Sequence, residues 1–146
     1  MDELTLKMNL VLPAPAPAVF DALTDPSKLV EWFGPQGFTI PAADFHPRVG
    51  ARYRIEMQPP DGEAFFLAGE FREVDAPNRL VYTFAWEDPD PEDVENVVSL
   101  SLAESGATTE LAFTQAPFTS EGRYALHRDG WTDSLEKLAG LVSARA

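Results

Sequence analysis

The sequence predicts an α+β domain in which a curved antiparallel sheet of six to seven strands packs against a long C-terminal helix. Three observations support this prediction. Most of the chain consists of segments in which apolar and polar residues alternate. Turns rich in proline, glycine and asparagine separate these segments. Near the C-terminus the apolar residues instead recur at every third or fourth position, which is typical of an amphipathic helix.

The first strand is expected over residues 3–12, where leucine and methionine alternate with polar residues. The run Pro-Ala-Pro-Ala-Pro at 13–17 follows it. Because proline fits the first turn of a helix, a short helix is expected to begin at the second or third proline. The sequence Thr-Asp-Pro at 24–26 ends this helix. Asp25 or Ser27 is then placed to cap a second short helix.

Six more strands are expected after these two helices. They occupy residues 38–40, 52–57, 64–74, 80–87, 94–103 and 108–115. Turn sequences such as Pro60-Asp61-Gly62 and Ser105-Gly106 separate them. Most of the apolar residues of each strand fall on one face, so the sheet is expected to bury one face and to expose the other to solvent.

The last predicted element is a helix over residues 120–143, with Ser120 as its N-cap. Charged residues occupy most faces of this helix, and one apolar stripe is expected to pack on the sheet. The stripe holds Tyr124, His127, Trp131, Leu135, Leu138 and Val142. Gly130 lies in the middle of the helix, where glycine costs roughly 1 kcal/mol relative to alanine. This cost indicates that a neighbouring group approaches the helix closely there.

The composition limits the classes of function. The chain of 146 residues has the length of one domain, and it has no cysteine to form a disulfide or a thiolate metal site. The formal net charge of -13 disfavours binding to nucleic acid or to anionic membrane surfaces. The N-terminus lacks the basic segment of a signal peptide, and no apolar run reaches the ~20 residues of a membrane span. A cytoplasmic location is therefore expected.

Short motifs span nearly the whole chain in a fixed order, and together they resemble a known superfamily. They are Ala14-Pro15, Val19-Phe20, Thr24-Asp25-Pro26, Glu31-Trp32-Phe33-Gly34-Pro35, Gly37-Phe38, Val49-Gly50, Pro60-Asp61-Gly62, Gly69-Glu70-Phe71, Pro77-Asn78-Arg79-Leu80, Gly130-Trp131 and Ser134-Leu135. The set resembles the helix-grip superfamily, also named START-like or SRPBCC. Within it, the resemblance is to the branch of homologues of the activator of the heat shock protein 90 ATPase.

The resemblance implies a single helix-grip domain over residues 1–146, with the START-like or Bet v-like fold. It also implies that a cavity between the sheet and the C-terminal helix binds a hydrophobic or amphipathic small molecule, such as a lipid, a polyketide or an aromatic compound. Two alternatives remain open, because a fold does not decide a function. One is a protein-interaction module like the co-chaperone domain, with a chaperone as partner. The other is a cyclase or dehydratase that uses His127 or a tyrosine as acid and base.

Large rings are numerous in the sequence, and around a concave sheet they rarely fill the space completely. We therefore expect a lined cavity, in which tyrosine and tryptophan also offer polar groups. The candidate ligand-binding residues are Trp32, Phe38, Tyr53, Phe65, Tyr82, Phe84, Trp86, Phe113, His127, Trp131 and Leu135. His127 has two interpretations: a polar hook inside the cavity, or a core histidine bonded to a buried partner.

Motifs for catalysis or for metal binding are missing. His46 and His127 lie far apart, without the HExxH spacing of zinc enzymes, and neither a G-x-S-x-G motif nor a phosphate-binding loop occurs. We expect no metal, no cofactor and no catalytic residue. Residues 34–37 are interpreted as a turn over the mouth of the cavity, and the acidic segment 87–95 as a solvated loop.

Charged residues alternate with the apolar ones in two of the central strands. They are Arg52, Arg54, Glu56, Glu70 and Arg72. We expect them on the solvent face, where opposite charges on neighbouring strands can pair. A shift of one residue in the pattern would turn them toward the cavity and a carboxylated ligand.

Overall fold

The computed structural model describes residues 4–145. Within this range the chain forms seven strands and three helices. The elements are β1 (Leu4–Leu12), α1 (Ala16–Thr24), α2 (Pro26–Trp32), β2 (Thr39–Asp44), β3 (Arg52–Gln58), β4 (Phe65–Asp75), β5 (Arg79–Trp86), β6 (Asn96–Ser105), β7 (Thr108–Phe118) and α3 (Glu121–Arg145). The first strand was expected from residue 3, which lies outside the described residues.

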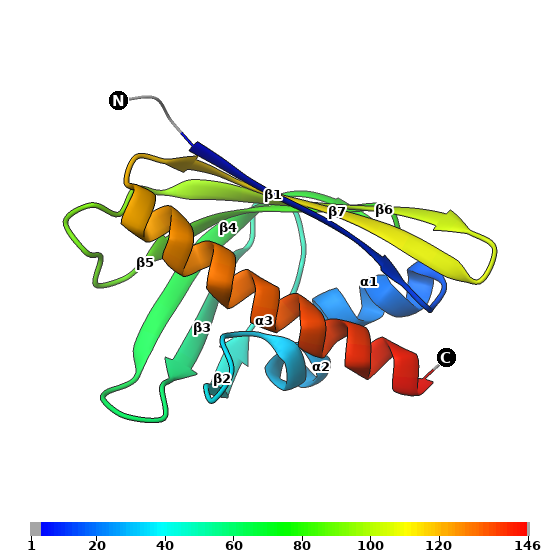
Figure 1. Ribbon diagram of the computed structural model, residues 1–146, viewed down its shortest axis with the longest axis horizontal. Coiled ribbons are helices and arrows are strands. Elements are labelled where there is room, and N and C mark those ends of the chain that lie inside the picture. Colours follow the sequence, from blue (N-terminus) through cyan, green and yellow to red (C-terminus); the bar gives the residue numbers. More distant parts are fainter. Residues whose placement is uncertain (1–3, 146) are drawn as a thin grey trace.

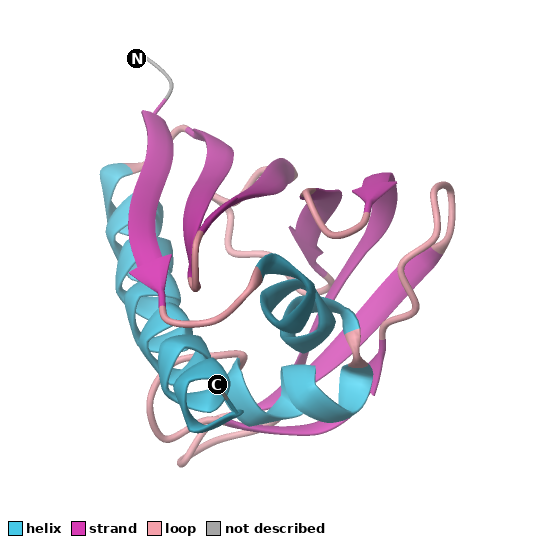
Figure 2. Ribbon diagram, turned by 90° about the vertical axis from the view of Figure 1, so that its right-hand side faces the viewer, coloured by secondary structure: helices cyan, strands magenta, loops and turns pink. Residues whose placement is uncertain are grey.

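The strands form one antiparallel sheet in the order β1-β7-β6-β5-β4-β3-β2. Consecutive hairpins connect β2 to β7, and β1 pairs with the far side of β7. The helices lie on one face of the sheet, with α3 running along it (Figure 1). Turned by 90°, the same view shows the strands curving around the helices (Figure 2). These features confirm the predicted helix-grip fold.

The ends of the helices follow the sequence signals. Pro15 is the N-cap of α1. The Asp25 carboxylate accepts a hydrogen bond from the Ser27 amide at 2.9 Å and so caps α2. The Ser120 hydroxyl accepts one from the Arg123 amide at 3.2 Å, at the start of α3. Both side-chain caps match the prediction, so local chemistry alone sets where α2 and α3 begin.

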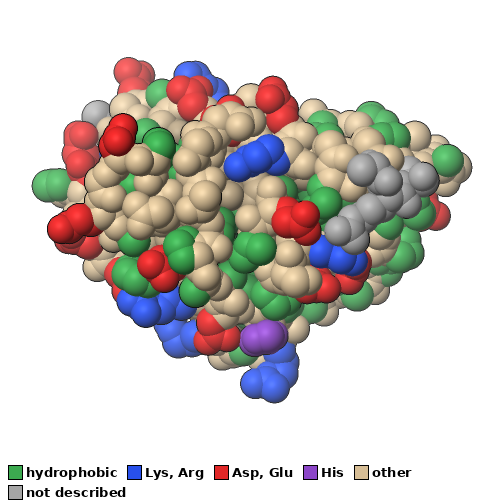
Figure 3. All heavy atoms as spheres, turned by 90° about the horizontal axis from the view of Figure 1, so that it is seen from below, with side chains coloured by type: hydrophobic (Ala, Val, Ile, Leu, Met, Phe, Trp, Pro, Cys, Tyr) green, Lys and Arg blue, Asp and Glu red, His purple; other side chains and the backbone are tan. Residues whose placement is uncertain are grey.

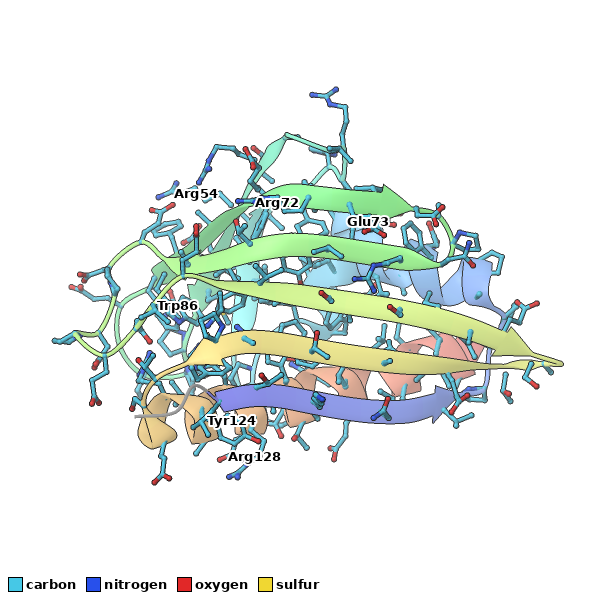
Figure 4. The ribbon with its side chains drawn as sticks, turned by 90° about the horizontal axis from the view of Figure 1, so that it is seen from above. Arg54, Arg72, Glu73, Trp86, Tyr124 and Arg128 are labelled. Atoms are coloured by element: carbon cyan, nitrogen blue, oxygen red, sulfur yellow. The ribbon has the colours of Figure 1, made fainter. Side chains whose placement is uncertain are left out.

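The buried stripe of α3 packs against the sheet as predicted. His127, Trp131, Leu135, Leu138 and Val142 are buried. Tyr124 is only partly buried, because it lies at the first turn of the helix against Phe118. On the opposite face of the sheet, Arg54 and Arg72 point outward (Figure 4).

The charged face of the central strands confirms their expected parity. Arg54 forms two hydrogen bonds with the Glu87 carboxylate, at 2.7 and 2.9 Å. Arg72 pairs with Glu70 at 3.2 Å. The apolar residues between them, such as Tyr53, are buried on the helix side. These arginines therefore do not reach the interior, where a carboxylated ligand would need them.

Gly69 marks a place where the curved sheet crowds its own backbone. A Cβ atom at this position would collide with the Thr83 carbonyl and lie 2.7 Å from the Tyr53 ring. The Tyr53 hydroxyl donates to the same Thr83 carbonyl at 2.6 Å. Glycine is needed here because no side chain fits between the two strands and the ring.

Several strand boundaries differ from the sequence prediction, including the ends of β6 and β7, which lie at Ser105 and Phe118 instead of residues 103 and 115. The strand expected at 38–40 extends from Thr39 to Asp44, because Pro41 and two alanines conceal its alternating pattern. The strand expected from residue 94 begins at Asn96, and Val94 is 41% exposed. The residues before Asn96 belong to the β5–β6 loop (residues 87–95). This loop packs against the start of α3 through the pair of Asp93 and Arg123, and it does not continue the sheet.

Candidate ligand-binding pocket

A pocket of about 480 Å³ lies between α3, the ends of β4 and β5, and two loops. The helix contributes one face with i, i+3, i+4 spacing: Arg123, Leu126, His127, Gly130, Trp131 and Ser134. The first loop is the 33–38 segment, and the second is the β5–β6 loop. This volume falls within the range of about 300–1,000 Å³ that is typical of small-molecule sites.

Aromatic rings form the sheet side of the pocket. Phe38 and Phe65 meet edge to face at 6.0 Å between ring centroids, and Phe65 meets Trp86 in the same way at 5.3 Å. Phe84 continues this row, 5.2 Å from Trp86. Edge-to-face contacts of this kind hold rings in fixed orientations. The wall is therefore apolar and ordered. Trp86 lies between Phe65 and Phe84 in this row, at the end of β5 where the β5–β6 loop begins (Figure 4).

Trp131 forms the inner end of the pocket. Its ring is 4% exposed and packs against Phe33 and Phe113, with centroids 5.6 and 4.4 Å away. The indole N–H donates to Gln115 Oε1 at 2.8 Å, and Gln115 Nε2 donates to Asn96 Oδ1, also at 2.8 Å. This buried chain fixes the ring, so the pocket presents its apolar surface and not its N–H group.

Both ring nitrogens of His127 are already hydrogen-bonded. Nε2 accepts from the Trp86 indole at 3.1 Å, and Nδ1 lies 2.7 Å from the Arg123 carbonyl. An Nδ1–H tautomer satisfies both contacts, so the ring is neutral. Burial lowers the pKa of His127 below its ordinary value of 6.5, and the nearby Arg123 charge acts in the same direction. This geometry favours the interpretation of His127 as a core histidine with a buried partner.

The β5–β6 loop forms the outer rim of the pocket, and an ion pair holds it against α3. Arg123 donates to both oxygens of Asp93, at 2.7 and 3.0 Å. The Asp93 side chain is only 7% exposed. The prediction of a fully solvated acidic loop is therefore wrong at this residue, because the bidentate pair draws it against the helix. Asp88 and Asp90 remain exposed at the rim.

The turn at residues 34–37 closes the opposite side of the mouth. The Gly34 amide donates to the Ser134 hydroxyl at 2.9 Å, and the Gln36 amide donates to the Asp133 carboxylate at 3.1 Å. Pro35 faces Gly130 on the helix. A Cβ atom at position 130 would lie 3.5 Å from the Pro35 ring, which is an ordinary contact. The sequence indicated a close approach at this position, but the neighbouring group is not close enough to require glycine at position 130.

The structure brings six of the predicted ligand-binding residues together in the pocket. They are Phe38, Phe65, Phe84, Trp86, His127 and Trp131. The other five do not line it and are buried in the core. These are Trp32, Tyr53, Tyr82, Phe113 and Leu135. That the pocket residues bind a ligand stays a prediction.

Phe45 explains why the two tyrosines are excluded from the pocket. This fully buried residue follows β2 and packs edge to face on Tyr53 and Tyr82, with centroids 5.4 and 5.9 Å away. It also contacts Phe71 at 5.0 Å. A ring from a loop thus fills the part of the concave sheet that the strand pattern left open. Phe45 was not predicted from the sequence, and neither were Met57, Phe66 and Leu126 in the pocket lining.

Comparison with known proteins identifies the family. A family model described as "Activator of Hsp90 ATPase homolog 1-like protein" matches residues 13–143. The chain belongs to this family. Its fold is consistent with a ligand-binding or a co-chaperone-like module. A comparison with curated proteins gives no significant match.

Several solved structures share the whole fold of this family member. A protein from Chromobacterium violaceum is 27% identical, with a TM-score of 0.87, and the match covers 94% of this chain and 96% of that chain. A protein from Mesorhizobium loti is also 27% identical, with a TM-score of 0.82 and coverage of 98% and 99%. The AHSA1 protein from Silicibacter pomeroyi, at 24% identity, has a TM-score of 0.87 and coverage of 98% and 100%.

The described part of the chain offers neither a membrane span nor a cluster of metal ligands. Between residues 4 and 145, no helix is long and apolar enough to cross a bilayer. Among the same residues, no group of three or more histidine, cysteine or acidic side chains is placed to hold a metal ion.

Proposed function

We propose that the protein binds an apolar or amphipathic small molecule in the pocket, without covalent chemistry. The observation that carries this proposal is the aromatic pocket itself, which lies beside the buried core. Its indole and imidazole groups bond to each other or to the core. Such a wall offers shape and apolar contact, which are the main terms in binding hydrophobic ligands.

The bonding of His127 disfavours the enzyme alternative. A general acid or base needs a nitrogen within hydrogen-bond reach of its substrate. Nε2 of His127 accepts from Trp86, and Nδ1 is bonded to the helix backbone. The alternative was an unspecified tyrosine, and none of the three tyrosines, Tyr53, Tyr82 and Tyr124, is in the pocket lining. A ligand would have to displace Trp86 before it could receive a proton from, or give one to, this ring.

Filling the pocket from the helix tests the proposal. Gly130 lines the pocket, whereas a Cβ atom at Gly140, on the same helix, would have nothing within 4 Å. A leucine at position 130 points back toward the preceding turn, which also lines the pocket. Gly130→Leu is expected to weaken the binding of the neutral fluorophore Nile red at least tenfold, whereas the matched control Gly140→Leu keeps wild-type affinity. Equal affinity in both variants would contradict the proposal.

The co-chaperone alternative rests on the description of the family. It predicts that the purified protein stimulates the ATPase of heat shock protein 90 in a concentration-dependent way. The wild-type protein and Gly130→Leu should then stimulate equally, because the pocket plays no part in such a contact. Stimulation by both proteins, without Nile red binding to either, would favour this alternative over the pocket.

A further inference from the structure

The charges around the mouth of the pocket are unequal. Its lining includes three carboxylates, from Asp88, Asp90 and Asp93, against one guanidinium, from Arg123. On the face of the molecule seen from below, acidic side chains are interspersed with lysine and arginine (Figure 3). The whole chain carries a formal net charge of -13. A ligand that enters the pocket therefore passes through a negative potential.

The single guanidinium of the lining is already neutralised. Arg123 directs Nε and one terminal nitrogen at the two oxygens of Asp93, in a bidentate pair. The Asp90 amide donates to the same carboxylate at 2.8 Å, which fixes it further. Breaking this pair to receive a ligand carboxylate would leave Asp93 buried without its partner. Arg123 is therefore a poor receptor for an anion.

Other cations near the pocket are also engaged. Lys137 does not line the pocket, and its ammonium lies 3.5 Å from the Pro35 carbonyl. Arg54 is paired with Glu87 and stacked over Phe66 on the outer side of the sheet. His127 is neutral because its unprotonated Nε2 accepts a hydrogen bond from the Trp86 indole N–H. Asp88 and Asp90, by contrast, form no ion pair within residues 4–145.

The aromatic wall is suited to a positive charge. The row Phe65, Trp86 and Phe84 is held edge to face beside the rim that carries Asp88 and Asp90. The faces of such rings attract cations, tryptophan most strongly. We propose that the pocket selects organic amines, with an aromatic or aliphatic body inside and an ammonium group at the acidic rim, and that it discriminates against carboxylates. This inference rests on the proposed binding function.

Three matched compounds test the charge preference: 2-naphthylmethylamine, 2-naphthylmethanol and 2-naphthoate. Their affinities are measured by calorimetry at low salt with the wild-type protein and with Asp88→Asn/Asp90→Asn. The wild-type protein is expected to bind the amine at least tenfold more tightly than the carboxylate, with the alcohol between them. The double variant should reduce this ratio toward one, as should 0.5 M salt. The control Asp75→Asn/Glu110→Gln changes the net charge equally on exposed residues outside the pocket lining and should keep the ratio.

The outcomes separate this inference from the proposed function. If the alcohol binds and Gly130→Leu abolishes its binding, but the carboxylate binds as tightly as the amine, the charge preference is wrong and the binding function stands. If none of the three compounds binds, and Nile red does not bind either, the proposed function itself fails. If the amine preference persists in Asp88→Asn/Asp90→Asn, or falls equally in the distant control, the rim is not its source and the inference is overturned.

Discussion

Replacing Trp131 with alanine tests whether this ring anchors α3 to the sheet. The ring is 4% exposed and packs 4.4 Å from Phe113, and its N–H is bonded to Gln115, which is completely buried. Removing a large core aromatic costs about 3–5 kcal/mol. Within that sum, leaving the Gln115 oxygen unpaired accounts for about 1–3 kcal/mol. Gln115 cannot turn to a new partner without also breaking its bond to Asn96.

Urea unfolding monitored by circular dichroism measures this loss, provided that the slope of free energy against urea stays constant. Trp131→Phe keeps an aromatic ring but removes the N–H and part of the packing, so a loss between about 1–3 kcal/mol for the hydrogen bond and the full loss of the alanine variant is expected. Tyr124→Ala, a partly buried ring on the same helix, serves as the control with a smaller loss. A loss below about 1 kcal/mol for Trp131→Ala would refute the reasoning, because such a value belongs to an exposed ring.

Two other predictions concern Gly69 and His127. Gly69→Ala should destabilise the fold by about 1–3 kcal/mol in the same assay, because the new methyl group meets the Thr83 carbonyl. The control Gly140→Ala, in open space, should be neutral or stabilising by up to about 1 kcal/mol. Equal effects of the two substitutions would contradict the steric argument. Since the pKa of His127 is lower in the folded state, the unfolded chain takes up the proton first as the pH falls below 6.5, and stability is lost in that range. In His127→Leu the free energy of unfolding should depend less on pH below 6.5. The same variant should lose about 1–3 kcal/mol of stability at pH 7, because the Trp86 N–H is left unpaired. An unchanged dependence on pH would show that His127 does not cause the loss of stability in acid.

Most of the fold could be predicted from the sequence because its signals are local. Alternation placed the inward face of the central strands, so Tyr53 was correctly expected to lie on the side opposite Arg54. Capping chemistry placed the start of α2 at Asp25 or Ser27, of which Asp25 is the cap, and the start of α3 at Ser120. Both kinds of signal depend on neighbours within a few residues. Where Pro41 interrupted the alternation, the length of β2 was underestimated.

The pocket could be predicted only in part, because its limits depend on contacts between distant segments. Parity shows that Tyr82 faces the helix side, but it does not show that Phe45, from a loop, covers it. Asp93 also looks like its acidic neighbours in the sequence. Asp93 differs from the solvated acidic residues around it only because Arg123, thirty residues further along the chain, pairs with it. Neither contact leaves a local pattern that could have been read.

The spacing of pocket residues along α3 has a consequence for how members of this fold can diverge. The helix residues that line the pocket all lie between Arg123 and Ser134, so none belongs to the last eleven residues of the helix (135–145). This last segment, with Leu138 and Val142 fully buried, only holds the domain together. Substitutions at the exposed positions between Arg123 and Ser134 can therefore alter what the cavity accepts, while buried residues such as Trp131, Leu138 and Val142 preserve folding. A library restricted to the exposed and glycine positions of those early turns would explore new ligand specificities on an unchanged scaffold.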